Sequence, residues 1–515
     1  MARRLLVFCF LLVVSSGSAW ANDIYIAQNA SGTADGSSCT SAYPYTFFNN
    51  AANWGTGAGK IGPGTTVHLC GFITTFNGST YDYLAFHGSG TVGNPITLYW
   101  EPNAKMSVPS CGTSQCIYIG GGSYLVIDGG TNGILEATQN GTLLSLQDPG
   151  GGLIGRPCSY CEFKNLTIQN LYVHTSVSDN KGGGNGILTG GPGVLFHDMV
   201  CHDVHWCFEY AGGFANDSIE MWNLTAYRTD HCFVIGYNGP GLNLSSGKVH
   251  NSECYDPFNW DTTSNTFHHD GIHAYFLNGA TANSLEFYNN YIHGSWGANS
   301  TANIYIQGFV PSFIFDNLFA DVNAQGTYQV WINGSSCNVF NNTFQTASTG
   351  KFDHVYINGC ASTTFVNNIV INGSHALWFS SGAGPLAFAQ NGLQGNVYWG
   401  LQGALPNGAW RWDNVIWTRD FSTWKNAARA AQPASGADNN STINNPKLDA
   451  NWVPQTGSSA IAVGVNLTAV VPQAARFDKA GNPRPASGPW DAGAYNHAAS
   501  SNPPSPPSTL GATVR

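Results

Sequence analysis

The sequence predicts an all-β chain, built as a single-stranded solenoid of stacked coils of about 25 residues each. Three observations lead to this fold class. Charged residues make up only 9% of the 515 residues while glycine occurs 62 times, which favours strands and turns over helices. A short phrase ending in Asn or Asp recurs along the chain, and a second phrase alternates between apolar and other residues. Two or three short strands per repeat therefore indicate a β-helix.

The first phrase places an aromatic or apolar residue two positions before Asn or Asp. It recurs with insertions and ends at Asn165, Asp198, Asn223, Asn251, Asn289, Asn317, Asn342 and Asn367. A side-chain amide at a coil corner can accept from and donate to the next coil. We expect these asparagines to stack as a ladder and to serve as scaffold.

The second phrase covers residues 303–306, 329–332, 354–357 and 376–379. Its period of two is typical of strands with one face in a core. The inward positions are filled by Ile304, Val330, Val355 and Leu377. The neighbouring outward column is then predicted to contain Glu209, Val234, His273, Tyr305, Trp331, Tyr356 and Trp378.

Residues 1–21 have the layout of a secretory signal peptide, with Arg3 and Arg4 before an apolar run and small residues near position 21. The β-helix domain is expected over residues 22–497, and a Pro/Ser-rich tail over 498–515. No later apolar run approaches the ~20 residues that span a bilayer. We expect a secreted protein, extracellular or periplasmic, with no membrane span.

The cysteines fit an oxidising compartment. Of the 13 cysteines, Cys9 lies in the signal peptide, and the even number that remains is typical of disulfides. Metal binding by Cys158 and Cys161 has no second CxxC or His pair to support it. The expected pairs are Cys39–Cys70, Cys111–Cys116, Cys158–Cys161, Cys337–Cys360, Cys207–Cys232 and Cys201–Cys254.

Segments at both ends of the repeat region carry a family resemblance. They are DIYIA (residues 23–27) and SGTVGNPIT (89–97) near the beginning, and DKAGNPR (478–484) and WDAGAY (490–495) near the end. Together with the coils, they resemble secreted proteins of the pectate-lyase-like superfamily over about residues 23 to 497. The resemblance implies a right-handed parallel β-helix. It leaves the reaction open, because the superfamily includes lyases, hydrolases, epimerases and non-enzymatic surface proteins.

Titratable residues gather in three successive coils at one end of the outward column. The register places His231 against Asp270, and His205, Asp230 and His269 in the column beside them, with neighbours about 4.8 Å apart. The insertion at residues 256–267 is expected to wall this cleft. The candidate catalytic residues are Glu209, Arg228, Asp230, His231, His269, Asp270 and His273.

These residue types leave several chemistries open. Glu209 paired with Asp230 or Asp270 could protonate a glycosidic oxygen and activate water, as hydrolases require. Alternatively, a base such as His231 or His269 could remove the proton beside a uronate in a β-elimination. The phrases around Asp230 and Asp270 faintly resemble those of polygalacturonases, but they occur in the opposite order, so that catalytic set is not carried over.

A cation would assist elimination by stabilising the developing charge. Arg228 is one candidate, and calcium held by Asp230 and Asp270 is the other; no further cofactor is expected. A transition-metal site is also consistent with the residue types, with ligands drawn from His205, His231, His269 and Asp270.

The aromatic part of the column is the candidate substrate-binding surface: Tyr305, Trp331, Tyr356 and Trp378 can stack on sugar rings. The net charge of −10 argues against a nucleic-acid partner. We therefore expect a monomer that binds a polysaccharide and cleaves it as a lyase or glycoside hydrolase. The alternative is a non-catalytic glycan-binding or surface-adhesion β-helix.

Overall fold

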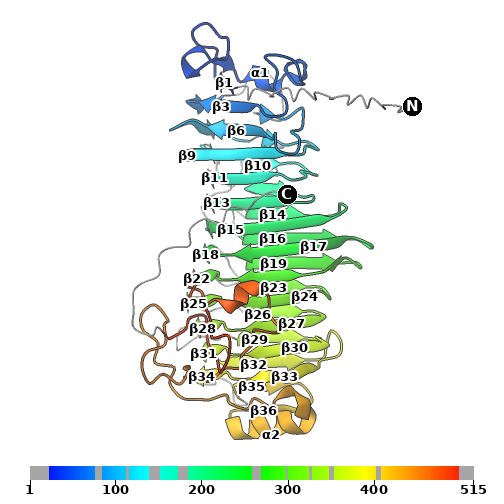
Figure 1. The fold of residues 1–515 in the computed structure, drawn as a ribbon, viewed down its shortest axis with the longest axis vertical. Coiled ribbons are helices and arrows are strands. Elements are labelled where there is room, and N and C mark those ends of the chain that lie inside the picture. The colour runs from blue at the N-terminus through cyan, green and yellow to red at the C-terminus, as the bar shows by residue number, and fades with distance from the viewer. Residues whose placement is uncertain are drawn as a thin grey trace, which may run out of the picture.

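The structure is a computed structural model that describes residues 23–75, 84–111, 115–138, 151–171, 184–257, 268–296, 300–323, 328–346, 353–401 and 408–497. The chain forms an elongated right-handed parallel β-helix, in which strands of successive coils stack from the N-terminal to the C-terminal end (Figure 1). The predicted signal peptide and the Pro/Ser-rich tail lie outside the described residues. The predicted fold class is confirmed.

One ladder of the solenoid is a 13-stranded sheet, which carries the candidate site. Along the stack its strands are β5 (Leu84–Ala85), β8 (Gln115–Tyr118), β10 (Gly151–Ile154), β12 (Ile187–Thr189), β14 (Trp206–Ala211), β16 (His231–Asn238), β19 (His269–Leu277), β23 (Ser300–Gln307), β26 (Tyr328–Asn333), β29 (Asp353–Asn358), β32 (His375–Ser380), β35 (Trp410–Trp412) and β36 (Ile416–Thr418). All its neighbouring strands pair in parallel except β35 and β36.

The other ladders join in a 23-stranded sheet. Its strands are β1 (Asp23–Ala27), β2 (Tyr43–Pro44), β3 (Thr66–Cys70), β4 (Phe72–Ile73), β6 (Ile96–Trp100), β7 (Lys105–Val108), β9 (Leu125–Ala137), β11 (Glu162–Gln169), β13 (Val194–His202), β15 (Asp217–Tyr227), β17 (Asn243–His250), β18 (Glu253–Tyr255), β20 (Thr281–Ala282), β21 (Leu285–Tyr288), β22 (Tyr291–Ser295), β24 (Pro311–Phe315), β25 (Leu318–Asn323), β27 (Ser336–Phe340), β28 (Thr343–Thr346), β30 (Ser362–Val366), β31 (Ile369–Ile371), β33 (Phe388–Gln394) and β34 (Val397–Trp399). A typical coil thus runs through three strands, such as β23, β24 and β25, before the chain returns to the 13-stranded sheet at β26.

The core fills the inside of the coils. The predicted inward residues Ile304, Val330, Val355 and Leu377 are all completely buried and stack on one another through successive strands. Burial of such apolar side chains stabilises the solenoid by about 1.5–3 kcal/mol each. The helix α2 (Phe421–Ala431) lies at the C-terminal end of the stack, where its buried Trp424 contacts Phe379 of the last coils (Figure 1).

The asparagine ladder exists, but part of its membership differs from the prediction. The ladder comprises Asn290, Asn317, Asn342, Asn368 and Asn396, all buried. From Asn317 onward, each amide oxygen accepts the backbone N–H of the preceding member at 2.9–3.0 Å. The predicted members Asn289 and Asn367 lie one residue earlier, at corners with φ of 56° and 57°. The predicted members Asn165, Asp198, Asn223 and Asn251 likewise lie at exposed corners with positive φ, outside the buried ladder. The prediction therefore holds at Asn317 and Asn342 only, because spacing alone does not show which residue of a corner points inward.

Four predicted disulfides are confirmed: Cys39–Cys70, Cys111–Cys116, Cys158–Cys161 and Cys337–Cys360. The predicted pairs Cys207–Cys232 and Cys201–Cys254 are wrong. Cys201 bonds Cys207 and Cys232 bonds Cys254, with Cα atoms 5.7 and 6.1 Å apart. All four side chains are buried in the core, so each bridge crosses between two ladders instead of following an outward column.

The C-terminal segment runs back along the flank of the solenoid. The backbone of Val465 exchanges hydrogen bonds with the side chain of Asn367, and the buried Arg484 pairs with the buried Asp316. These contacts tie the segment to the coil corners beside the asparagine ladder. None of the described helices is long and apolar enough to cross a membrane.

Candidate functional site

The outward column has the predicted register. Backbone pairing carries it through seven strands of the 13-stranded sheet, from β14 to β32. The register shift in the β19–β23 pair falls between His269 and Asp270, before the column residue His273. The successive partners are Glu209, Val234, His273, Tyr305, Trp331, Tyr356 and Trp378. The inward neighbours are core residues, so the pleat of each strand turns this set outward.

The last four residues form an aromatic column, defined here as Tyr305, Trp331, Tyr356 and Trp378. All four are half-buried, and successive rings lie 4.9, 5.4 and 4.6 Å apart at their centroids. They are tilted by 45°, 61° and 46°, so no ring is covered face to face by its neighbour. The column therefore presents parts of its aromatic faces to a ligand.

Two residues that sequence reasoning missed frame the aromatic column. Tyr328 packs against Trp331 and Tyr356 with centroid distances of 5.2 and 5.1 Å. The guanidinium of Arg411 lies 3.8 Å from the ring centroid of Trp378 and follows it in the register. Arg411 stands at the column position of the next strand, where continued alignment could have found it.

At the other end, His273 stacks on Tyr305 with centroids 5.0 Å apart, so the aromatic column adjoins a polar cluster. One part of this cluster surrounds Asp270 of β19. Its Oδ2 lies 3.3 Å from Nε2 of His231, 3.2 Å from Nε2 of His268 and 3.5 Å from Nδ1 of His273. The Asp270 group, as we name these four residues, brings together predicted residues from two adjacent coils and adds His268.

A second set surrounds Asp230. Its Oδ2 lies 2.9 Å from Nε2 of His205, and its Oδ1 lies 3.3 Å from Nδ1 of His269. The predicted neighbouring column of His205, Asp230 and His269 is therefore present. The two aspartates have separate histidine partners.

Burial restricts which of these residues can touch a substrate. Asp230, His231, His269 and Asp270 are at most 2% exposed. Glu209 and His273 are 6% and 7% exposed, whereas the side chain of His268 is 44% exposed. Direct contact with a substrate in this conformation thus falls to the rim of the cluster and not to its centre.

The electrostatics of the Asp270 group follow from burial and pairing. Burial opposes ionisation of Asp270, but its contacts with His231 and His268 outweigh this effect and lower its pKa. The contact with Asp270 raises the pKa of His268. Burial lowers the pKa of His231, and it lowers that of His273 to about 3. The lowered pKa values favour neutral imidazoles at His231 and His273 beside a charged carboxylate, whereas the raised pKa of His268 favours its protonated form.

The pKa of Glu209 shifts in the opposite direction from that of Asp270. Burial raises the pKa of its carboxyl to about 7, although the charge of Arg156 and the amide of Asn185 both oppose the shift. Asn185 donates from Nδ2 to Oε2 of Glu209 at 2.6 Å. A carboxylic acid with a pKa near neutrality can hold a proton and release it under ordinary conditions, which suits a general acid.

The raised pKa of Glu209 predicts a pH-dependent stability. The pKa of Glu209 is 4.5 in the unfolded chain and about 7 in the folded protein. Between these two pH values, the folded protein keeps a proton on Glu209 that the unfolded chain has lost. The free energy of unfolding should therefore fall as pH rises through this window, by about 3 kcal/mol from this group. Thermal unfolding of wild type and Glu209→Gln over this range checks the difference. Parallel profiles would contradict the assignment.

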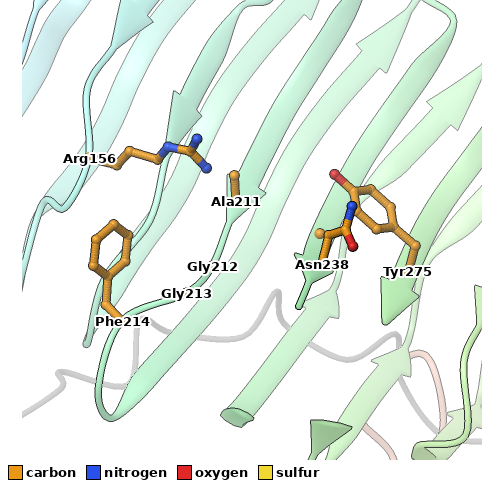
Figure 2. Close-up of a pocket in the computed structure, with 8 residues that line it drawn as sticks. Arg156, Ala211, Gly212, Gly213, Phe214, Asn238 and Tyr275 are labelled. Carbon is orange, nitrogen blue, oxygen red and sulfur yellow. The ribbon is translucent and has the colours of Figure 1, made fainter. Parts of the chain in front are cut away.

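A hollow of about 450 Å³ lies at the end of β14 that follows Glu209, and it contains Arg156, whose charge acts on Glu209 (Figure 2). It is lined by Arg156, Ala211, Gly212, Gly213, Phe214, Gly236, Asn238 and Tyr275. Ala211, Gly236 and Tyr275 occupy one column of β14, β16 and β19. A Cβ at Gly236 would overlap the Tyr275 hydroxyl, so a larger residue here would displace the ring from its place across the neighbouring strand.

Arg228 was predicted to be a catalytic residue, but its contacts are with Asp203 and Tyr227. It pairs with Asp203, with Nε to Oδ1 at 2.9 Å, and lies over the ring of Tyr227. The basic residue whose charge acts on Glu209 is Arg156, which the sequence analysis missed because it lies outside the aligned strands. In the insertion predicted to wall the cleft, residues 258–267 lie outside the described residues.

The Asp270 group is also the place where a metal ion could be held. One ligand atom from each of His231, His268, Asp270 and His273 lies within 4.8 Å of all the others. Asp230 is not a member of this group. Calcium bound jointly by Asp230 and Asp270 remains a prediction, and the three nitrogen donors here differ from the oxygen ligands that calcium prefers.

No family model matches the chain, and no curated protein matches it. A search of solved structures finds one described as "Crystal structure of pectate lyase Pel9A", at 14% sequence identity and a TM-score of 0.37. The match covers 93% of this chain and 96% of that one.

Proposed function

We propose that the protein binds a polysaccharide along the aromatic column and cleaves it at the adjoining polar end. One observation carries this proposal: a single outward column runs without a break from Glu209 through His273 to Trp378. A chain-like ligand lying on the aromatic residues would extend directly toward the polar end. A binding surface and an acid are thus aligned on one face of a rigid scaffold.

The binding step rests on the aromatic column. Half-buried, tilted rings that are fixed in place lose little conformational entropy when a flat apolar ligand face packs on them. The indole nitrogens donate to Asn333 and Asp413 at 3.2 and 3.1 Å, which holds Trp331 and Trp378 in position. Sugar rings have apolar faces of this kind, and the coil spacing repeats the contact along the ligand.

The chemical step rests on Glu209. In hydrolysis it would donate its proton to the glycosidic oxygen while water attacks the anomeric carbon. In β-elimination a base would take the proton beside a uronate carboxylate, and Glu209 would protonate the departing oxygen. Arg156 in the adjoining hollow supplies the positive charge that a uronate would require.

The test is an assay of the mature protein against neutral and uronate-containing polysaccharides, with and without added divalent cations. Unsaturated-product absorbance and reducing ends are followed together. A rise in both signals would identify a lyase, and a rise in reducing ends alone would identify a hydrolase. Binding without either signal would overturn the proposal in favour of a non-catalytic glycan-binding protein.

Trp331→Ala is expected to weaken polysaccharide binding about tenfold, because it removes the largest ring at the centre of the aromatic column. Affinity electrophoresis or calorimetry with the best ligand of the panel measures the change. Trp399→Ala is the matched control, since Trp399 is exposed on β34 of the other sheet. Equal losses in the two variants would rule out the aromatic column as the binding surface.

A further inference from the structure

We propose that His231, His268, Asp270 and His273 form a binding site for one divalent transition-metal ion of the zinc type. The site lies where the polar cluster meets the aromatic column, because His273 stacks on Tyr305. This inference does not depend on polysaccharide cleavage, since metal binding is measured without a glycan.

The distances from Asp270 to the three histidines match the ligand spacing of a tetrahedral site. Oδ2 of Asp270 lies 3.3, 3.2 and 3.5 Å from the facing nitrogens of His231, His268 and His273. Zinc binds imidazole nitrogen and carboxylate oxygen at about 2.0–2.2 Å, which puts neighbouring ligand atoms of a tetrahedron about 3.3–3.6 Å apart. Asp270 thus already stands at this spacing from all three histidines, and all four ligand atoms lie within 4.8 Å of one another.

Among the described residues, most of the donor atoms have no hydrogen-bond partner outside the group, although the side chain of Gln307 interacts with His273. Within the described part of the chain, neither ring nitrogen of His231 or His273 has a partner in hydrogen-bonding geometry, and the same holds for Oδ2 of Asp270. His231 and His273 are only 2% and 7% exposed, and Asp270 is completely buried. Leaving such groups unsatisfied costs about 1–3 kcal/mol each. A single cation would satisfy lone pairs from all three residues at once.

The surroundings support a preformed site with an access route. His231 and Asp270 are direct partners in the backbone register of β16 and β19, which fixes two donors on rigid strands. Oδ1 of Asp270 accepts the backbone N–H of Ala302 at 3.0 Å, so its other oxygen is held toward the histidines. The side chain of His268 is 44% exposed and provides the side from which an ion can enter.

The donor set selects the class of ion. Three imidazole nitrogens and one carboxylate oxygen suit Zn²⁺ and its neighbours in the first transition series. Calcium and magnesium prefer shells made of oxygen, with six or more ligands. The site is therefore expected to bind Zn²⁺ and Co²⁺ in the presence of a large excess of Ca²⁺.

Chelator-treated protein is titrated with Zn²⁺ in equilibrium dialysis with metal analysis, and with Co²⁺ followed by visible absorption. We expect one ion per chain and a Co²⁺ spectrum typical of four-coordinate nitrogen and oxygen ligation. His268→Gln should lower the affinity at least about 100-fold, since loss of a direct ligand exceeds the cost of losing an outer-shell partner. His268 is partly exposed, so this variant is expected to fold.

His205→Gln is the matched control, because His205 belongs to the same cluster but contacts Asp230 at 2.9 Å. It should bind Zn²⁺ as wild type does, and circular dichroism should be unchanged in both variants. Absence of stoichiometric Zn²⁺ binding by wild type would overturn the proposal. So would an unaffected His268→Gln, or a loss confined to His205→Gln, which would assign the ion to other ligands.

Discussion

Replacing Glu209 by Gln is expected to reduce the kcat of polysaccharide cleavage about 100- to 10,000-fold, the range over which general acids contribute. Gln keeps the size of the side chain and an oxygen that can accept from Asn185, but it has no proton to give. Because burial raises the pKa of Glu209 to about 7, wild-type activity should fall as pH rises above 7 and the acid form is lost. Steady-state rates against pH on the best substrate measure both effects.

Glu220→Gln is the control for this prediction. Glu220 lies on β15 in the other sheet, where it pairs with His250, and its side chain is 41% exposed. Its activity and pH profile should match those of wild type. A Glu209→Gln enzyme that retains full kcat, or wild-type activity that increases through pH 7, would show that Glu209 is not the acid.

The second large effect is expected at the docking of the C-terminal segment. Arg484→Ala should destabilise this docking by about 3–5 kcal/mol, because it leaves the buried carboxylate of Asp316 without its partner. Arg484 also donates to the carbonyl of Gly493 at 3.1 Å. Thermal unfolding and limited proteolysis within residues 446–497 report the change.

The size of this effect should depend on pH. Burial raises the pKa of Asp316 to about 7 even though Arg484 opposes the shift, so removing Arg484 raises it further. At pH 6 the lone carboxyl of Asp316 is neutral, so the loss of stability caused by Arg484→Ala is smaller than at pH 8.

Arg429→Ala is the control for this prediction. Arg429 is at an exposed position of α2, so its replacement should change stability by less than about 0.5 kcal/mol. Arg484→Met combined with Asp316→Asn should recover part of the loss; no recovery would mean that the unpaired charge is not the cause.

Much of the site could be predicted where the chain is regular. The alternation in residues 303–306 and its repeats determines which side chains face outward, so the aromatic column and the pairing of His231 with Asp270 follow from register alone. The direction of the side chains at the coil corners could not be predicted. The asparagine at position 289 or 290, and the partner of Cys207, depend on how each turn directs its side chains.

Repeat spacing and strand alternation are enough to predict the solenoid and the order of residues along the outward column, because side chains of a strand alternate every two residues whatever surrounds them. The right-handed coil was expected from the family resemblance alone. The burial of these groups, the effect of Arg156 on Glu209 and the place of His268 in the Asp270 group become visible only in three dimensions. These properties arise between coils and between segments far apart in the chain, as with Arg484 and Asp316. No local pattern encodes burial and charge pairing of that kind.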